Sequence, residues 1–250
     1  MKLNSKLFLS FTLNFLFLIL IVLFVQYKGG IKYVVNKLTN KDNSITAWDK
    51  KVSDYLPPVD GSVLFIGDSH LALHPWNEYA NFKYANRAVS GYKISDINLD
   101  VIKGKPKCVV LSIGTNDIQH GSKVDLVIRN LHSLLNKIKN KWPEAFFIYV
   151  TPPDPNVELY EKLIRPKHPK ITRPDEIKYK ALSLCAKNNG FIVLKANTAF
   201  IDGLHIDPNS AKKIATDVQT LLNNLTIQGI NRPDSLNEHG KIISEIKNPL

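Results

Sequence analysis

The sequence predicts an α/β fold, in which a parallel sheet is covered on both faces by helices. Two observations lead to this prediction: short apolar runs recur along residues 62–227, and amphipathic stretches with helical periodicity separate them. Strands that alternate with helices are typical of parallel sheets, because each helix carries the chain back across one face of the sheet. A third observation is the length, since 250 residues suffice for one domain with a sizeable core plus extra segments at the ends.

Five apolar runs are the expected strands. The run Val63–Ile66 is short, continuous and rich in β-forming residues, and it stops at a Gly-Asp-Ser turn, which is typical of a buried strand. The other runs are Phe82–Ala85, Val109–Ile113, Phe146–Val150 and Phe191–Leu194.

Three amphipathic stretches are the expected helices. In each of them apolar residues recur at helical spacing and form one face that can pack against a sheet. They span Val124–Ile138, Ile177–Ala186 and Ala211–Leu222. Asn189-Gly190 after the second stretch is typical of a helix C-cap, because glycine readily adopts a left-handed conformation.

The apolar segment Leu7–Val25 carries no charge and is about long enough to cross a bilayer as a helix. Lysines flank it, and no small-residue cleavage pattern follows it. The sequence therefore predicts a single-pass membrane anchor over residues 1–28, with a cleaved signal peptide and a secreted protein as the alternative. We expect an extracytoplasmic, periplasmic domain, although the lysines after the segment favour the opposite orientation.

Two further segments flank the domain. Residues 29–61 are expected to form a stem, in which Trp48 and Tyr55 lie at roughly helical spacing and pack on the edge of the domain. Residues 228–250 are polar and are expected to form a peripheral tail.

The formal net charge is +11, but no block of five or six like charges occurs. Nucleic-acid binding needs clustered cations, so we expect a lysine-rich solvated surface and no nucleic-acid partner. Attraction to anionic lipids or to an acidic glycan is the functional alternative. Two cysteines, Cys108 and Cys185, are too few for a disulfide framework. Both are expected to be small buried residues, and a single bridge between them stays open.

Ser69 is the candidate nucleophile. It follows Gly67 and Asp68 at the end of the first strand, and ligands of open α/β sheets bind beyond the carboxyl ends of strands. The alternative is an ordinary Gly-Asp-Ser turn. The segment is not a G-x-S-x-G elbow, because Leu71 stands where that motif has its second glycine. A serine needs a base and an oxyanion pocket elsewhere in the chain.

Asp202-Gly203-Leu204-His205 supplies the candidate base. An aspartate three residues before a histidine can accept from one ring nitrogen, which leaves the other nitrogen to take the serine proton. A structural loop histidine is the alternative. Gly91 and Asn116 are the candidate oxyanion donors, through a backbone N–H and a side-chain amide respectively. Their alternatives are an ordinary loop glycine and an Asn-Asp helix cap.

His70 and His74 are four residues apart and could pair on a helix, but no third metal ligand is evident nearby. The sequence therefore gives no reason to expect a metal site.

Taken together, these blocks resemble the SGNH hydrolases, also called the GDSL esterase/lipase family. The resemblance covers Ser62–Leu222 and rests on Gly67-Asp68-Ser69, Gly91, Gly114-Thr115-Asn116-Asp117 and Asp202-Gly203-Leu204-His205. It implies a three-layer α/β/α domain with a flavodoxin-like, five-stranded parallel sheet. His70 departs from the family pattern, since many members have leucine there.

The resemblance also implies the roles of the site residues. Ser69 would be the nucleophile, His205 the base and Asp202 the residue that orients His205. The backbone N–H groups of Ser69 and Gly91 and the side chain of Asn116 would form the oxyanion hole. Such a reaction needs no metal or organic cofactor.

Four functions fit this sequence. A serine ester hydrolase acting on a short acyl group, for instance an O-acetyl group of an envelope glycan, is the first. The enzymatic alternatives are an O-acyltransferase with the same residues and a lysophospholipase. For the latter, the proline-rich residues 152–174 are expected to form a loop near the site that shapes an acyl groove. A catalytically inactive binding module is the alternative outside enzymes. The acyl chain length, the alcohol and the oligomeric state are not evident from the sequence.

Overall fold

A computed structural model describes residues 5–27, 47–79, 81–153, 155–172, 175–196 and 202–227. The chain divides into two compact units, Met1–Lys50 and Lys51–Leu250. The expected tail, residues 228–250, lies outside the described residues, as do residues 28–46 of the expected anchor and stem.

The first unit contains the helix α1 (Ser5–Tyr27). Large apolar side chains along it are exposed, including Phe11 at 68% and Leu20 at 63%. Among the described residues, no helix combines the length and the apolar character needed to span a bilayer. The predicted transmembrane helix is therefore not supported. Polar residues interrupt the apolar run in its first half, where the amide of Asn14 donates to the carbonyl of Ser10.

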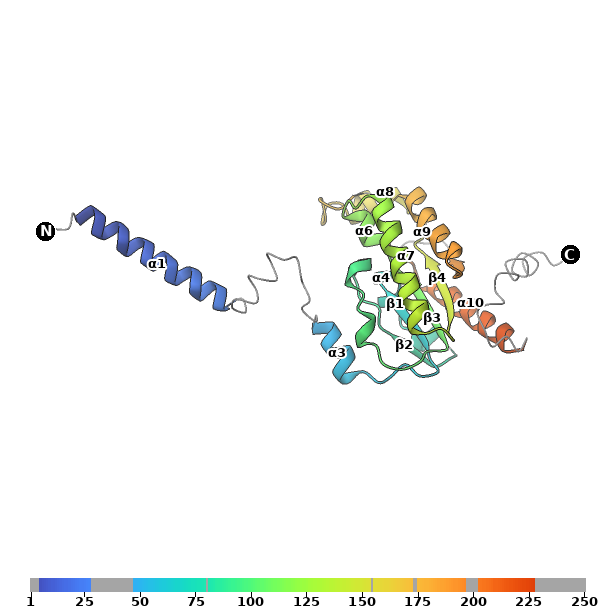
Figure 1. The fold of residues 1–250 in the computed structure, drawn as a ribbon. Coiled ribbons are helices and arrows are strands. Elements are labelled where there is room, and N and C mark those ends of the chain that lie inside the picture. Colours follow the sequence, from blue (N-terminus) through green and yellow to red (C-terminus); the bar gives the residue numbers. More distant parts are fainter. Residues whose placement is uncertain are drawn as a thin grey trace. The chain divides into compact units, whose positions relative to one another are not determined.

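The second unit is built on a five-stranded sheet with the order β2-β1-β3-β4-β5 (Figure 1). All four strand pairs are parallel, and the order is that of flavodoxin-like folds. The strands are β1 (Val63–Gly67), β2 (Tyr84–Asn86), β3 (Cys108–Ser112), β4 (Phe146–Thr151) and β5 (Ile192–Lys195).

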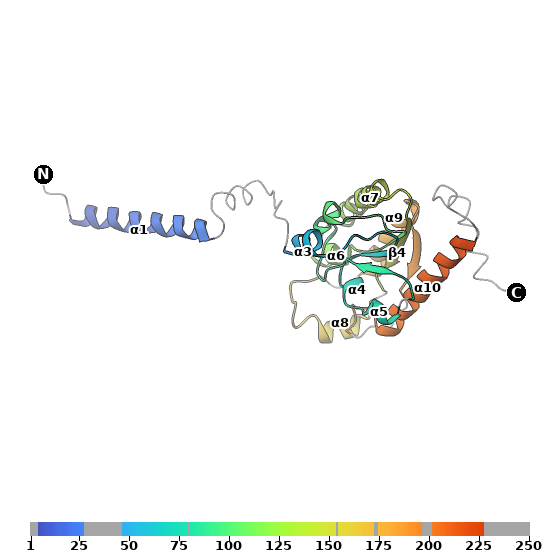
Figure 2. The same ribbon diagram turned by 90° about the horizontal axis from the view of Figure 1, so that it is seen from below.

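Helices cover both faces of this sheet (Figure 2). The helices α7 (Val124–Lys141) and α9 (Glu176–Asn188) pack on one face, and α10 (Pro208–Ile227) packs on the other. This arrangement confirms the predicted three-layer α/β/α fold. It also places the carboxyl ends of the five strands along one edge, where the loops that follow them meet.

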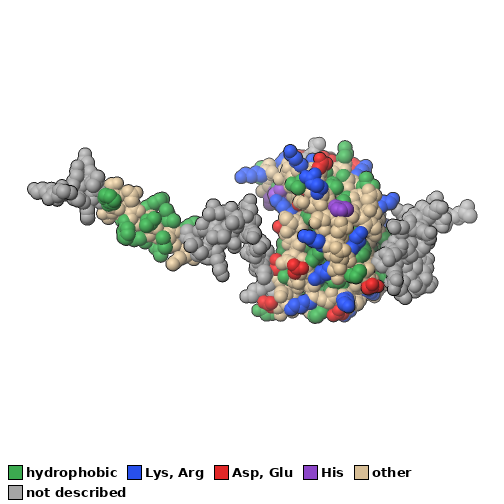
Figure 3. Space-filling view, in the orientation of Figure 1, with side chains coloured by type: hydrophobic (Ala, Val, Ile, Leu, Met, Phe, Trp, Pro, Cys, Tyr) green, Lys and Arg blue, Asp and Glu red, His purple; other side chains and the backbone are tan. Residues whose placement is uncertain are grey.

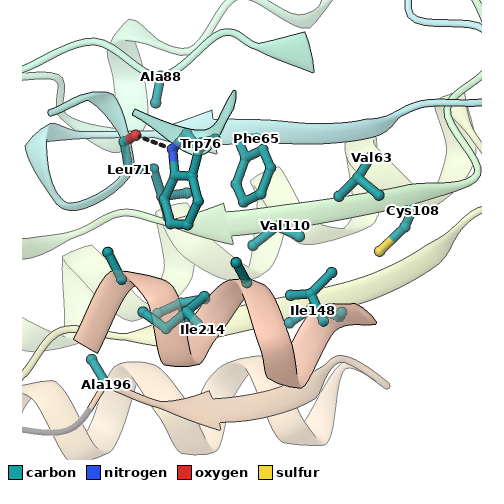
Figure 4. Packing of buried hydrophobic residues seen from close by; sticks show 14 of the residues in the cluster. Val63, Phe65, Leu71, Trp76, Ala88, Cys108, Val110, Ile148, Ala196 and Ile214 are labelled. Carbon is teal, nitrogen blue, oxygen red and sulfur yellow. Dashed lines mark hydrogen bonds between the residues drawn. The ribbon is translucent and has the colours of Figure 1, made fainter. Parts of the chain in front are cut away.

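The core beneath α10 fixes the end of β1 (Figure 4). The rings of Phe65 and Trp76 stack with their centroids 4.5 Å apart, and Trp76 donates its indole N–H to the carbonyl of Leu71 at 2.7 Å. Leu71 lies in α4 (Ser69–Ala72) and is fully buried. Because this short helix is held to the core through Leu71 and Trp76, Ser69 at its start is held as well.

The strand positions agree with the sequence to within two residues, and the shift at the last strand has a clear cause. Phe191 was expected to start the last strand, but its N–H donates to the carbonyl of Ala186 and so belongs to the end of α9. Asn189 and Gly190 close α9 as predicted, with Gly190 at φ +80°. Cys108 and Cys185 are both buried and free.

The short helices were not predicted. They are α5 (Trp76–Tyr79), α6 (Thr115–Gln119), α8 (Val157–Leu163), α4 and the 3₁₀ turns η1 (Ile94–Asp96) and η2 (Leu99–Val101). The helix α3 (Ala47–Tyr55) confirms the helical spacing of Trp48 and Tyr55. The expected packing of Tyr55 is wrong, because this side chain is 77% exposed.

Candidate active site

The backbone at Gly67 allows β1 to end directly beside β3. Gly67 has a φ of +147°, and a Cβ atom there would lie 1.9 Å from the carbonyl oxygen of Ser112. The next N–H, that of Asp68, donates to the same carbonyl at 3.0 Å. Asp68 then caps α4, because its Oδ1 accepts from the N–H of His70 at 3.0 Å. Ser69 is thereby fixed at the carboxyl edge of the sheet as the first residue of α4.

The loop after β5 brings a histidine and an aspartate to Ser69. His205 Nε2 lies 3.0 Å from Ser69 Oγ, and His205 Nδ1 lies 2.7 Å from Asp202 Oδ2. Because an ionised carboxylate only accepts, Nδ1 carries the proton and Nε2 is free to accept from the serine hydroxyl. The structure therefore brings these three predicted residues together in the order that proton transfer requires.

Asp202 is held in this position by the backbone of its own loop. Its Oδ1 accepts from the N–H groups of Leu204 and His205 at 3.0 and 2.9 Å. Partial burial acts to raise the pKa of the Asp202 carboxyl, but the N–H and ring of His205 outweigh it and hold this pKa below its usual value. Asp202 therefore stays ionised around neutral pH.

Gly203 lets α8 approach this loop closely. It has a φ of +87°, and a Cβ atom would lie 2.3 Å from the backbone nitrogen of Tyr160. Its carbonyl accepts from the N–H of Asn156 at 3.2 Å. The start of α8 thus supports the loop that carries Asp202 and His205, although the sequence led us to expect a loop throughout this region. The helix forms because Asn156 Oδ1 accepts from the N–H of Leu159 at 3.1 Å as an N-cap.

The two candidate oxyanion donors belong to connected segments. Gly91 is exposed at φ +82°, in a loop that is attached to β1 where the N–H of Val89 donates to the carbonyl of Gly67 at 2.9 Å. Asn116 donates its side-chain amide to the carbonyl of Tyr92, the residue after Gly91, at 2.9 Å. The amide keeps a second N–H, so this bond does not exhaust its donors.

The alternative reading of Asn116 as a helix cap is wrong. Gly114, with a φ of +110°, is the N-cap of α6, and Asn116 lies inside its first turn. The following residue, Asp117, accepts from the N–H of Ile94 at 3.0 Å. Two neighbouring side chains of α6 therefore hold the loop that contains Gly91.

Two buried ionisable residues flank Ser69, and the sequence did not indicate that the pKa values of their side chains would be shifted. Asp68 is fully buried and His70 is 1% exposed, with its ring centroid 5.8 Å from that of His205. Within the described part of the chain, Asp68 Oδ2 and both ring nitrogens of His70 have no hydrogen-bond partner. Burial raises the pKa of Asp68 to about 7 and lowers the pKa of His70 to about 3. The only property of Asp68 that the sequence indicates is that aspartate is a common N-cap residue of helices.

These opposite shifts predict opposite pH dependences of stability. Asp68 binds its proton more tightly in the folded protein, so its contribution to stability is present at acidic pH and is lost as pH rises toward about 7. His70 binds its proton more weakly in the folded protein, so its contribution is lost as pH falls from its unfolded value toward about 3.

Asp68→Asn keeps the capping oxygen and removes the carboxyl. We expect its melting temperature to exceed that of the wild type at pH ~8 and the gap to close toward pH ~4, with a full effect of up to about 4 kcal/mol. His70→Leu should show the opposite pH dependence: its melting temperature should exceed that of the wild type most near pH ~4. Thermal melts between these two pH values measure both, and parallel curves for all three proteins would refute the assignment.

No group of three or more His, Cys, Asp or Glu side chains that could hold a metal ion occurs among the described residues. His70 faces His205, as described above, and His74 packs against the ring of Trp76 with centroids 5.7 Å apart. Neither contact indicates metal binding.

Residues 60–174 match the GDSL-like lipase/acylhydrolase family. This part of the chain is similar to the family. The matched range contains Ser69, Gly91 and Asn116 and ends before Asp202 and His205. The match indicates an ester-hydrolysing enzyme. No curated protein matches the chain significantly.

Several solved structures are similar to this chain. A candidate platelet activating factor from Streptococcus pneumonia is 20% identical, with a TM-score of 0.57 over 77% of this chain and 97% of that chain. A lipolytic G-D-S-L family member from Veillonella parvula is 14% identical, with a TM-score of 0.48 over 65% and 98%. The esterase EstA from Pseudoalteromonas sp. is 14% identical, with a TM-score of 0.44 over 67% and 99%.

Proposed function

We propose that the protein is a serine esterase in which Ser69 is the nucleophile, His205 the general base and Asp202 the residue that orients His205. One observation carries this proposal: a continuous chain of two contacts, 3.0 Å from Ser69 Oγ to His205 Nε2 and 2.7 Å from His205 Nδ1 to Asp202 Oδ2. Both lengths lie within hydrogen-bond range, and the two contacts use different nitrogens of one ring.

The reaction follows from these contacts. As Ser69 Oγ attacks the ester carbonyl carbon, its proton passes to His205 Nε2, and Asp202 stabilises the imidazolium that forms. The proton then passes to the leaving alcohol, and an acyl-serine remains. A water molecule gives its proton to His205 and attacks the acyl group, which releases the acid and restores Ser69.

The oxyanion of each tetrahedral intermediate would be held by the N–H groups of Ser69 and Gly91 and by the amide of Asn116. The open surroundings of Gly91 support its role, because no heavy atom of the described residues beyond its chain neighbours lies within 4 Å of where a Cβ would be. Asn116 is oriented through its bond to Tyr92, so its amide need not reorganise during the reaction.

Fluorophosphonate labelling tests the proposed mechanism. We expect covalent labelling of the native protein at Ser69, identified by peptide mass spectrometry, because an activated serine attacks phosphorus as it attacks an ester. Heat-unfolded protein serves as the control and should not react. Absence of labelling in the folded protein would overturn the proposal in favour of an inactive binding module.

We further propose that the substrate is a short acyl ester, such as an O-acetyl group on an envelope glycan. Turnover of a panel of esters of increasing acyl length tests the preference for a short acyl group, and a preference for long chains would favour a lysophospholipase. Deleting the gene and measuring glycan O-acetylation measures the second. Higher acetylation after deletion supports the esterase, whereas lower acetylation would mean an acyltransferase.

We also propose that α1 attaches the enzyme to a membrane, with the GDSL-like domain on the extracytoplasmic side. The uncharged run Leu7–Val25 and the exposed apolar side chains of α1 support this location. Membrane fractionation and a carboxyl-terminal alkaline phosphatase fusion test it. Recovery in the soluble fraction would refute the attachment, and an inactive fusion in intact bacteria would refute the orientation.

A further inference from the structure

A basic segment lies beside the candidate active site. Residues 155–172, which contain α8, follow the carboxyl end of β4. One end of this segment contacts the catalytic loop, where Asn156 donates to the carbonyl of Gly203 and where the backbone of Tyr160 leaves no room for a side chain on Gly203. The segment therefore borders the loop that presents Asp202 and His205.

The other end of the basic segment is attached to the helix that carries Asn116. Thr172 donates its N–H to the carbonyl of Gln119 at 2.7 Å, and its hydroxyl lies 3.0 Å from the carbonyl of Ile118. The segment is also closed on itself, because the hydroxyl of Tyr160 donates to the carbonyl of Thr172 at 3.2 Å. It thus bridges from the base to the candidate oxyanion helix and forms one wall of the site.

The exposed charge of this wall is mainly positive. Lys162, Lys167 and Lys170 are exposed, and within the described residues none of them pairs with a carboxylate. Arg165 is different, since it pairs with Glu161 at 3.3 Å and donates to the carbonyl of Ile171 at 2.7 Å. Glu158 is the remaining carboxylate of residues 155–172.

Figure 3 shows Lys and Arg side chains, with an acidic side chain among them, at the upper end of the domain on the face where Figure 1 draws α7 in front. The arginine is used to hold the loop, whereas the lysines have flexible stems and unengaged ammonium groups. Three such groups on one segment beside the site attract anions, and the attraction weakens as salt screens it.

We propose that the basic segment recognises an anionic group, a carboxylate or a phosphate, on the substrate of the esterase. This inference rests on the proposed function, because it assigns the charge of the ester that reaches Ser69. A neutral ester would meet the same catalytic groups without this attraction, so the enzyme should prefer the charged ester of a matched pair.

The test compares para-acetoxybenzoate with its neutral amide, para-acetoxybenzamide. The ratio of their kcat/KM values is measured for the wild type and for Lys162→Gln/Lys167→Gln/Lys170→Gln, so that the intrinsic reactivity of each ester cancels. We expect the ratio to fall about fivefold in the variant, and to fall in the wild type when salt is raised from about 0.02 M to about 0.5 M. A second arm with para-acetoxyphenyl phosphate tells whether a phosphate is preferred to a carboxylate.

A control variant removes the same charge from the opposite edge of the sheet. Lys107, Lys137 and Lys187 are exposed, and they lie just before β3 and near the carboxyl ends of α7 and α9. Changing these three to Gln should leave the ratio unchanged. If the ratio of kcat/KM values fell equally in both variants, the overall charge of the protein would explain the effect, and the proposal would be overturned.

Two outcomes separate this inference from the proposed function. The wild type and the Lys162, Lys167 and Lys170 variant could hydrolyse both esters with the same ratio of kcat/KM values. This result would overturn the role of the basic segment alone. Failure of the wild type to hydrolyse either ester, together with absent fluorophosphonate labelling, would overturn the esterase itself. Circular dichroism of each variant checks that it is folded.

Discussion

Ser69→Ala is expected to lower the turnover of p-nitrophenyl acetate at least about a thousandfold while the protein stays folded. The variant removes only the Oγ atom, whose contact with His205 Nε2 is the one side-chain hydrogen bond found for Ser69 within the described residues. The N–H of position 69 and the oxyanion candidates remain, so a small residual rate over water is expected. Initial rates and a thermal melt of the same preparation measure both effects.

Ser133→Ala is the matched control for this variant. Ser133 is exposed on α7, and alanine is a better helix former than serine, so turnover and melting temperature should both stay near the wild type. Ser69→Ala should also abolish fluorophosphonate labelling, which the control should retain. A Ser69→Ala protein that turns over at the rate of the wild type would remove Ser69 from the mechanism.

The strands of the sheet could be predicted well because the central strands are recognisable from their own residues. Strands that are buried on both faces read as continuous apolar runs, and β1 and β3 are buried at every position. The edge strand β2 is only three partly buried residues, and the expected run lay two residues too early at its start. Its position is set by pairing with β1, which a local pattern does not contain.

The short helices escaped prediction because tertiary contacts form them. A helix of four or five residues is not stable by itself, since nucleation costs more than so few hydrogen bonds return. Asp68 caps α4, and the left-handed backbone of Gly114 starts α6, so each helix exists where a strand end and a loop hold it. Composition and periodicity cannot reveal either.

The candidate site was visible in the sequence to a different degree for each group. Asp202 and His205 are close in sequence, and their spacing alone indicated a contact. The burial of His70 was not visible, because it depends on α4 being drawn onto the core by Leu71 and Trp76. The basic segment was seen as a proline-rich loop, whereas its attachment to α6 through Thr172 joins residues more than fifty positions apart.

Asp202→Asn should be nearly as damaging as the loss of the nucleophile, for a reason that the loop geometry makes specific. Asp202 Oδ1 accepts from two backbone N–H groups, so an asparagine would keep its own Oδ1 there and turn its NH₂ group toward His205 Nδ1. Two donors cannot face each other, and the ring would shift its proton to Nε2. That nitrogen would then donate to Ser69 Oγ and could not take its proton.

We expect turnover of p-nitrophenyl acetate to fall by about a thousandfold or more, as loss of the correct tautomer does in serine hydrolases. The fold should be retained, because both backbone contacts of the loop survive the substitution. NMR of the His205 imidazole distinguishes this role from a merely structural one. The wild type should show a hydrogen-bonded Nδ1 proton on His205, and the variant should lack it.

Asp125→Asn makes the same chemical change at an exposed position in the first turn of α7 and should leave both the rate and the His205 proton unaltered. If Asp202→Asn instead keeps wild-type turnover, orientation of His205 by Asp202 contributes nothing to the reaction. If turnover falls while the Nδ1 proton persists, the aspartate acts by its charge and not by fixing the tautomer. The 2.7 Å contact between Asp202 Oδ2 and His205 Nδ1 predicts that both signals disappear together.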